Sequence, residues 1–324
     1  MSNYTCKDVA RLTSLILDAV NTVVKGKQSA AKKVLCTILA KGHVLIEDIP
    51  GVGKTTLAIA FAKAMKLKQR RIQFTPDVMA SDVTGFNMYN KETGKFTFVD
   101  GAVMCNLLLA DEINRTSPKT QSALLEAMEE GKVTVDKNVI PIPRPFTVIA
   151  TQNPLGFTGT QPLPEAQLDR FTICISMGYP SMENEIDIMR MRAKGGSTAQ
   201  RAEAVEEVAS ASDLVEMQAA VEEVRACDEM LEYIYKLVFA TRTNPLIEMG
   251  ASPRASINLL RCAKAMAAME GRDYIIPLDA AEMFLPIVSH RITLARTPGA
   301  RGKSTKEVLE GVFSSVKPPK LTIR

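Results

Sequence analysis

Tryptophan is absent from the 324 residues, and histidine occurs only twice, at His43 and His290. Two histidines so far apart disfavour a metal site built from imidazoles, and His43 is expected to pack at the start of a strand. The six cysteines are scattered and include no C-x-x-C pair. Several of them stand within apolar runs, which is typical of reduced thiols in a cytoplasmic core rather than of disulfides.

Long apolar runs and an excess of one charge are missing too. No stretch of about 18 apolar residues occurs, so no membrane span is expected. The amphipathic pattern at residues 12–18 contains an acid and does not fit a signal peptide. The 40 basic and 36 acidic residues give a net charge of +4, which does not indicate a nucleic-acid or membrane surface. We therefore expect a cytoplasmic protein of about two domains, with no nucleic-acid partner.

Four short segments in a fixed order carry the chemistry that is present. The first follows the apolar run 43–46 and reads Pro50-Gly51-Val52-Gly53-Lys54-Thr55-Thr56. The others are the strings LLLADE at 107–112, VIATQNP at 148–154 and LDRF at 168–171. Any one of them could be chance, but together they predict that the chain binds and hydrolyses a nucleoside triphosphate.

The first segment has the composition that a phosphate requires. Glycines let backbone N–H groups approach phosphate oxygens, and a helix beginning at about Lys54 would direct its dipole at the same anion. Lys54 would reach the β- and γ-phosphates, and Thr55 would bind Mg²⁺. Asp48 stands where the pattern G-x-x-x-x-G-K-[ST] has its first glycine, and its carboxylate is expected to oppose the anion mildly. Taken alone, the segment also fits a glycine-rich turn with an exposed lysine.

Two acids end the second segment. Residues 107–110 form a short apolar run, typical of a strand buried on both faces of a parallel sheet. Asp111 would hold Mg²⁺ through its water shell, and Glu112 would take a proton from the attacking water. An ordinary acidic turn is the alternative. Ligands of open α/β sheets, however, lie at the carboxyl ends of strands, where both motifs are expected.

The alternation of apolar strands and helical stretches predicts a three-layer α/β core with a mostly parallel sheet. Two helices within residues 1–41, divided by a turn at 25–27, precede the sheet. Two insertions in the core, at 86–99 and 132–142, are expected to form β-hairpins. The expected strands are 44–47, 71–74, 107–110, 146–150 and 171–176, and the expected core helices are 54–65 and 117–130.

The β-signals disappear after residue 179. The chain is therefore predicted to divide into a nucleotide-binding core at 1–179 and a smaller, all-helical domain at 180–324. A polar loop is expected at 194–198 and a loose tail at 316–319. The expected helices of this second domain are 181–192, 202–209, 219–240, 256–270 and 277–295.

Three strings resemble the signature of the MoxR family of AAA+ ATPases. They are LLADEINRTSPKTQSALLEAM at 108–128, LPEAQLDRF at 163–171 and GASPRAS at 250–256. The resemblance covers nearly the whole chain. It implies an AAA+ P-loop core followed by a helical lid, with the two hairpins as the helix-2 insert and the pre-sensor-1 insert.

The resemblance also implies roles that spacing alone does not give. Asn153 would orient the attacking water. Arg170 would be an arginine finger that reaches the γ-phosphate held by a neighbouring subunit, where a guanidinium suits the spreading charge. Arg254 on the lid would be the second sensor, and Gly26 with its neighbours would lie against the adenine.

Each of these three polar residues has a plainer alternative. Arg170 could form a salt bridge to Asp169 or Glu165, Arg254 could be a solvated residue at a helix start, and Asn153 could be a turn residue. The predicted catalytic residues are Lys54, Glu112, Asn153, Arg170 and Arg254. The predicted nucleotide-binding residues are Gly26, Asp48, Pro50, Gly51, Val52, Gly53, Lys54, Thr55 and Thr56, with Thr55 and Asp111 as the magnesium ligands.

The resemblance finally implies a Mg²⁺-dependent ATP hydrolase that works as a chaperone-like motor in a homo-oligomeric ring, a hexamer. Its partner would be a protein client, often one with a von Willebrand factor A domain, and its action could include metal or cofactor insertion. Three alternatives stay open. One is a nucleotide-switched scaffold with little turnover, against which Glu112 argues. The others are a DNA translocase, disfavoured by the near-neutral charge, and a magnesium-chelatase-like motor subunit.

Overall fold

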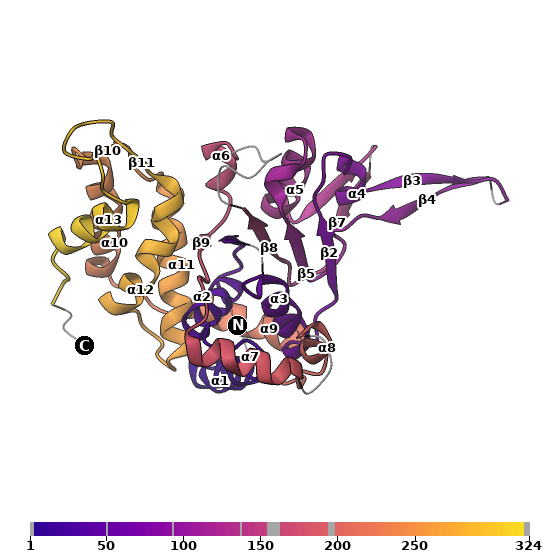
Figure 1. Ribbon diagram of the computed structural model, residues 1–324, viewed down its shortest axis with the longest axis horizontal. Helices are drawn as coiled ribbons and strands as arrows, with labels where there is room; N and C mark the ends of the chain where they lie inside the picture. The colour runs from indigo at the N-terminus through magenta and orange to yellow at the C-terminus, as the bar shows by residue number, and fades with distance from the viewer. Residues whose placement is uncertain are drawn as a thin grey trace.

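A five-stranded sheet forms the centre of the chain (Figure 1). In spatial order its strands are β2 (Gln69–Gln73), β5 (Leu107–Asp111), β8 (Thr147–Gln152), β1 (Val44–Glu47) and β9 (Ile173–Ile175). Each neighbouring pair is parallel, so the predicted parallel sheet is confirmed. The computed structural model describes residues 3–49, 51–92, 94–136, 138–153, 163–193 and 198–320.

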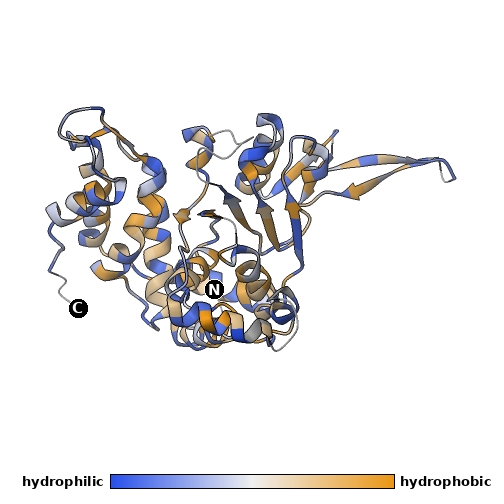
Figure 2. Ribbon diagram, viewed as in Figure 1, coloured by the Kyte–Doolittle hydropathy of each residue, from blue (hydrophilic) through white to orange (hydrophobic). Residues whose placement is uncertain are grey.

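The three inner strands β5, β8 and β1 are buried on both faces. Leu107 and Leu109 belong to one hydrophobic core, whereas Leu108 and Ala110 belong to a second core on the other face, and all are fully buried. Because side chains of a strand alternate between its faces, covering both faces requires an unbroken apolar run. Figure 2 shows the resulting hydrophobic centre of the sheet.

Helices cover both faces of the sheet. The first core contains residues of α1 (Cys6–Asn21), α2 (Gln28–Leu39) and α3 (Lys54–Ala64), and α5 (Pro118–Glu130) contributes to the second. Ser117 caps α5 by accepting a hydrogen bond from the N–H of Thr120, and Gly131 ends the helix in a left-handed conformation. The two predicted N-terminal helices and the predicted helix of 117–130 are confirmed.

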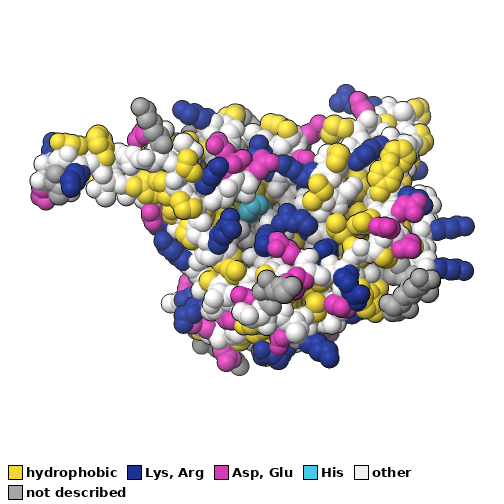
Figure 3. All heavy atoms as spheres, turned by 180° about the vertical axis from the view of Figure 1, so that it is seen from behind, with side chains coloured by type: hydrophobic (Ala, Val, Ile, Leu, Met, Phe, Trp, Pro, Cys, Tyr) yellow, Lys and Arg dark blue, Asp and Glu magenta, His cyan; other side chains and the backbone are white. Residues whose placement is uncertain are grey.

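Both predicted hairpins are present. β3 (Gly85–Asn90) pairs with β4 (Lys95–Asp100), and β6 (Lys132–Val135) pairs with β7 (Asn138–Pro141). The β3–β4 hairpin projects from the body as an arm (Figure 1) and carries hydrophobic side chains along it (Figure 3). Phe96 near its tip is 71% exposed. Figure 1 also shows the short α4 (Ala80–Thr84) at the base of this arm.

In the C-terminal part, the described residues are mainly helical but include a pair of short strands. Its β10 (Ile247–Met249) and β11 (Thr293–Leu294) are antiparallel, which corrects the all-helical prediction. Strands this short leave no alternating pattern in a sequence, and their pairing depends on a distant segment. The helices are α7 (Met182–Ala193), α8 (Thr198–Glu203), α9 (Ala211–Glu223), α10 (Asp228–Thr243), α11 (Pro253–Met269), α12 (Pro277–Val288) and α13 (Thr305–Ser315).

Three predicted helices were wrong in extent, each because of a distant contact. The predicted 202–209 helix ends at Glu203, since the N–H groups of Val208 and Ala209 instead donate to the carbonyl of Ala64. The predicted 219–240 helix is two helices, because Arg225 in the gap bonds to the backbone of Asp273. The predicted 277–295 helix ends at Val288 and is followed by a 3-10 turn at 289–291, because the next residues, 293–294, pair with β10.

Other short elements connect these units. α6 (Glu165–Leu168) and the 3-10 turn η1 (Ile113–Arg115) were not predicted. Of the predicted loop at 194–198, residues 194–197 lie outside the described residues and Thr198 begins α8. The predicted domain boundary falls beside Gly178, whose φ is +62°, and stays a prediction. Within the described ranges, no helix is both long and apolar enough to cross a bilayer.

Candidate nucleotide-binding and hydrolysis site

The phosphate loop joins β1 to α3. Gly51 and Gly53 have φ values of +87° and +97°, which favour glycine, and no atom lies within 4 Å of a Cβ built on either residue. Gly53 is the N-cap of α3 and has no side chain to cap the helix. The first-turn N–H groups at Lys54, Thr55 and Thr56 are therefore donors available to an anion. Pro50 lies outside the described residues.

Lys54 folds back over its own loop. Its ammonium donates to the carbonyl oxygens of Asp48 at 2.6 Å and Ile49 at 3.3 Å. Partial burial lowers the pKa of Lys54, while the carboxylates of Asp48, Asp111 and Glu112 oppose that shift. The residue therefore stands among three acids whose negative charge favours its protonated form.

Asp48 is turned away from the loop and is only 7% exposed. Its Oδ2 accepts hydrogen bonds from the N–H groups of Met177 at 2.6 Å and Gly178 at 2.7 Å, and from the hydroxyl of Ser176 at 3.0 Å. Its Oδ1 accepts from the N–H of Ile49 at 3.0 Å. The carboxylate therefore ties the start of the phosphate loop to the turn that follows β9, an arrangement that the sequence did not indicate.

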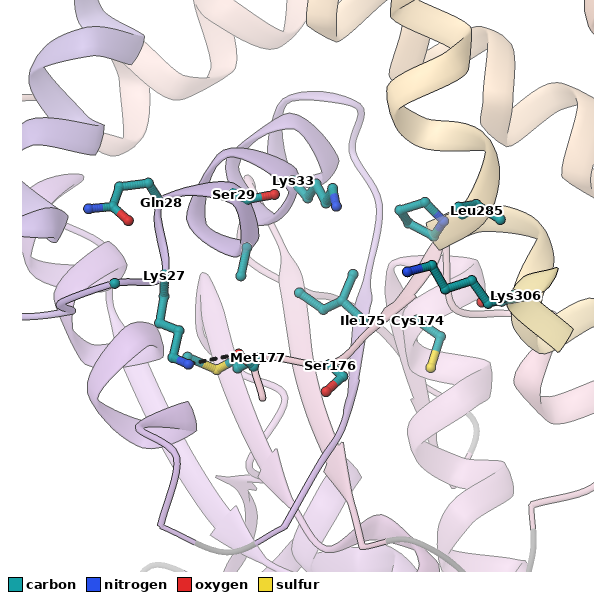
Figure 4. A pocket seen from close by; sticks show the side chains of 14 residues that line it. Lys27, Gln28, Ser29, Lys33, Cys174, Ile175, Ser176, Met177, Leu285 and Lys306 are labelled. Carbon is teal, nitrogen blue, oxygen red and sulfur yellow. Dashed lines mark hydrogen bonds between the residues drawn. The ribbon is translucent and has the colours of Figure 1, made fainter. Parts of the chain in front are cut away.

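Lys27 holds the same turn from its other side. Its buried ammonium donates to the carbonyl oxygens of Met177 and Gly178, both at 2.8 Å. Figure 4 shows Lys27 extending from the start of α2 towards Met177, beside a cavity of about 440 Å³. The turn after β9 is thus bound by a cation at its carbonyls and by an anion at its amides.

A cavity of about 150 Å³ adjoins the phosphate loop. Its walls come from residues 23–25, from Lys27, from the loop itself and from Pro180 and Ile188. Three valines line it together with Pro180 and Ile188, and such apolar walls suit the face of an adenine ring. Gly26 does not line this cavity but lines the cavity of about 440 Å³; its φ is +71°, and a Cβ there would come within 2.4 Å of Asn184 in α7.

The two acids follow β5. Asp111 is buried, and its carboxylate accepts hydrogen bonds from Arg71 Nε at 2.7 Å and Thr151 Oγ1 at 3.3 Å. The N–H of Glu112 donates to the same hydroxyl of Thr151 at 2.9 Å. The end of β8 therefore fixes both acids at the carboxyl edge of the sheet.

Glu112 is the centre of a polar cluster. Asn153 Nδ2 donates to its Oε1 at 3.1 Å, and Arg115 Nη1 donates to its Oε2 at 2.7 Å. Gln73 lies at 3.5 Å from the same Oε2. These donors, Arg115 foremost, hold the pKa of Glu112 below its ordinary value. The backbone φ of Glu112 is +57°, which is uncommon outside glycine and typical of functional sites.

Arg170 and Arg254 lie together elsewhere. Arg170 lines a cavity of about 540 Å³ formed by α5, β6 and α6, and none of the described phosphate-loop residues lines it. Arg170 donates to the carbonyl of Leu125 at 3.0 Å and pairs with Glu129 at 2.5 Å. Arg254 pairs with the same Glu129. Neither of the salt bridges considered for Arg170 is present among the described residues.

The structure therefore brings the predicted residues into two groups. The first group lies at the carboxyl edge of the sheet and consists of Lys54, Thr55, Asp111, Glu112 and Asn153. The second group is the separate pair of Arg170 and Arg254. Four further residues complete these groups and were not predicted from the sequence, namely Arg71, Arg115, Glu129 and Thr151. Arg115 lies inside the motif at 108–128, Thr151 lies inside the motif at 148–154, and Glu129 directly follows the first of these. Nearness to a motif was the only sequence signal for these three residues.

Comparison with known proteins agrees with this geometry. The model of the ATPase family associated with various cellular activities (AAA) matches residues 43–173, and that of the AAA lid domain matches residues 239–312. A crystal structure of a proposed ATPase from Cytophaga hutchinsonii superposes with a TM-score of 0.88, at 38% identity and 97% coverage of both chains.

Two relatives extend the likeness over almost the full length. The chain is 45% identical to the uncharacterized protein YeaC of Bacillus subtilis, over 97% of both chains. It is 38% identical to the protein named Chaperone MoxR1 of Mycobacterium tuberculosis, over 93% of this chain and 81% of that one. With the phosphate loop, the acid pair and the helical lid in place, the chain belongs to the MoxR family of AAA+ ATPases.

Proposed function

We propose that the chain hydrolyses ATP at sites shared between neighbouring subunits of a ring and uses the cycle to remodel a client protein. The observation that carries this proposal is the separation of the site residues into two groups on one subunit. The group around Glu112 has a phosphate loop and a base, and its two arginines, Arg71 and Arg115, are already paired with Asp111 and Glu112. Arg170 lines another cavity, which none of the described phosphate-loop residues lines, and Arg254 pairs with Glu129 of the same cavity. Head-to-tail packing of two copies supplies both halves.

The residues at the carboxyl edge of the sheet divide the work as follows. The glycine-rich loop and the first turn of α3 bind the phosphates, and Lys54 neutralises the β- and γ-phosphate oxygens. Glu112, ionised because of its donors, takes the proton of the attacking water. Asn153 lies at 3.1 Å from Glu112 and orients that water. Arg170 of the adjacent copy stabilises the charge that develops on the γ-phosphate.

Thr55 and Asp111 fit a magnesium ion. A hydroxyl and a buried carboxylate are the hard oxygen donors that Mg²⁺ prefers, and Asp111 stands at the same edge of the sheet as the phosphate loop. Magnesium bound there would neutralise negative charge on the phosphates. Arg71 at 2.7 Å and Thr151 at 3.3 Å hold the Asp111 carboxylate in a fixed orientation.

The projecting β3–β4 hairpin is the surface that we assign to the client. Its Phe86, Met88, Tyr89 and Phe96 are each exposed by 43–71%, an unusual density of apolar groups for a solvated strand pair. Tyr89 and Phe96 are directly opposite each other, with ring centroids 5.3 Å apart. We propose a client with a von Willebrand factor A domain, in keeping with the family, and metal or cofactor insertion as one result of remodelling. The name of the mycobacterial chaperone supports a remodelling role.

Mixing two inactive variants tests the shared site. Lys54→Ala removes the phosphate ligand and Arg170→Ala removes the finger, and each homogeneous preparation should be inactive. A mixed ring contains junctions where an intact phosphate loop meets an intact Arg170. The mixture is expected to recover up to about a quarter of wild-type ATPase, because one junction in four is then complete in a random ring. Absence of any recovery in rings shown to contain both variants would contradict the proposal.

A further inference from the structure

Glu129 binds both arginines at once. Its Oε2 lies 2.5 Å from Arg170 Nη1, and its Oε1 accepts a hydrogen bond from Arg254 Nη2. The two guanidinium groups reach it from different parts of the chain, Arg170 from the turn after α6 and Arg254 from the first turn of α11. One carboxylate therefore joins a residue of the core to a residue of the lid.

The pairing does not serve the stability of the helices concerned. Glu129 lies in the last turn of α5 and Arg254 in the first turn of α11. A helix favours cations at its C-terminus and anions at its N-terminus, so each charge stands at the less favourable end of its own helix. Helix stability therefore does not explain why these two charges pair where the core meets the lid, which indicates a functional reason for the contact.

Holding two guanidinium groups together needs an anion. Two guanidinium groups bound to one carboxylate carry like charges and repel each other. Both side chains are only partly buried, with 33% of Arg170 and 38% of Arg254 exposed. Without the carboxylate they would separate into solvent, each gaining the freedom of a long side chain. Arg170 would keep only its bond to the carbonyl of Leu125.

A second tie joins the same two parts of the chain. Asp169, next to Arg170, accepts hydrogen bonds from Ser252 Oγ at 3.1 Å and from Arg291 Nε at 2.7 Å. Arg291 is buried, and its guanidinium also donates to the carbonyls of Phe171 and Thr172. The backbone around Arg170 is therefore fixed to the lid, and its side chain is fixed by Glu129.

We propose that Glu129 is a positioning residue that presents Arg170 and Arg254 as one unit to the γ-phosphate of the adjacent subunit's nucleotide. The proposal rests on the proposed function, in which Arg170 acts on a neighbour. When the phosphate arrives, it joins or replaces the carboxylate between two guanidinium groups that are already close together. Glu129 sets the rate of the chemical step and takes no part in binding ATP, because it lies outside the phosphate loop.

The test compares ATPase kinetics of the full-length wild type with those of Glu129→Gln and Glu129→Asp at saturating protein concentration. Glu129→Gln is expected to lower kcat at least tenfold and to leave KM within twofold, since the arginine pair should bind the charge that develops in the transition state more strongly than the phosphate of bound ATP. Glu129→Asp keeps the charge with a shorter reach and should recover part of the loss. Glu126→Gln is the matched control, because Glu126 lies one turn earlier on α5, lines the same cavity and is exposed. It should leave both constants unchanged.

Three outcomes would overturn the proposal. They are a kcat for Glu129→Gln equal to that of wild type, a raised kcat, which would make the carboxylate a brake, and a loss confined to KM. Arg170→Ala measured in parallel separates the two levels of inference. If its rate is normal, the shared-site proposal fails. If its rate collapses while that of Glu129→Gln is normal, only the role of Glu129 fails. Sedimentation of each variant with a non-hydrolysable ATP analogue verifies that assembly is unchanged.

Discussion

Replacing Asp48 by glycine would restore the strict phosphate-loop pattern, yet we expect it to damage the protein. The carboxylate accepts four hydrogen bonds, three of them from backbone amides, of which those of Met177 and Gly178 belong to the turn after β9. In Asp48→Gly these two amides lose their acceptor next to the buried Lys27. An unsatisfied buried donor costs about 1–3 kcal/mol.

The expected loss follows from these contacts. We assign about 2 kcal/mol to the amide of Met177, and about 1 kcal/mol to the amide of Gly178 because water can reach it. Together they give a destabilisation of about 3 kcal/mol. For a chain of this size, with an unfolding entropy of about 2.1 cal/mol/K per residue, that is a fall in Tm of about 4 °C. The Ser176 hydroxyl adds little, since it can rotate towards solvent.

Differential scanning calorimetry of wild type, Asp48→Gly and Asp48→Asn measures this effect. Asp48→Asn retains one oxygen acceptor and should fall between the other two. Nucleotide affinity, measured with a fluorescent ATP analogue, should not improve in Asp48→Gly, because the carboxylate does not face the phosphates. A variant as stable as wild type with tighter ATP binding would refute the assignment of Asp48 to the turn after β9.

Three further changes have outcomes that follow from single contacts. Glu112→Gln should lower the hydrolysis rate by about 10²-fold or more while ATP stays bound, as filter binding would show; normal hydrolysis would remove Glu112 from the role of base. Gly26→Ala should weaken nucleotide binding and lower Tm, because its φ is +71° and the new Cβ would displace Asn184; an unchanged affinity would exclude this segment from the base pocket. Burial lowers the pKa of His43 to about 4 in the folded state. Between pH of about 6.5 and 4 the histidine is therefore protonated in the unfolded state only, and the free energy of unfolding should decline as pH falls through this range. Urea unfolding of His43→Gln should show a flatter decline, and a slope equal to that of wild type would contradict this origin.

Local sequence patterns account for the strands, hairpins and site residues that could be predicted. The run at 107–110 identifies β5 because a strand covered on both faces must be apolar throughout, and the turns at 90–94 and 136–138 identify the two hairpins. The phosphate loop, Asp111 and Glu112 were recognisable because each contributes chemistry at a fixed place after a strand. The chain order of these motifs placed them at one edge of the sheet.

Contacts between distant segments account for the helix ends and side-chain pairings that could not be predicted. The break before α10 depends on Arg225 bonding to Asp273, and the end of α8 depends on the carbonyl of Ala64. The role of Asp48 depends on a turn 130 residues away. The pairing of Glu129 with Arg254 spans 125 residues. No window of sequence contains both members of such a pair, so a pattern of spacing cannot indicate them.

The central claim is that each active site needs two subunits, and the dependence of the ATPase rate on protein concentration tests it most directly. The rate per subunit of wild type should rise with concentration until rings are complete. In Arg170→Ala it should stay at least about 10³-fold lower at every concentration, which is the smaller effect expected for an arginine finger. A rate per subunit that is independent of concentration and unaffected by Arg170→Ala would contradict the account and would indicate a self-contained ATP hydrolase.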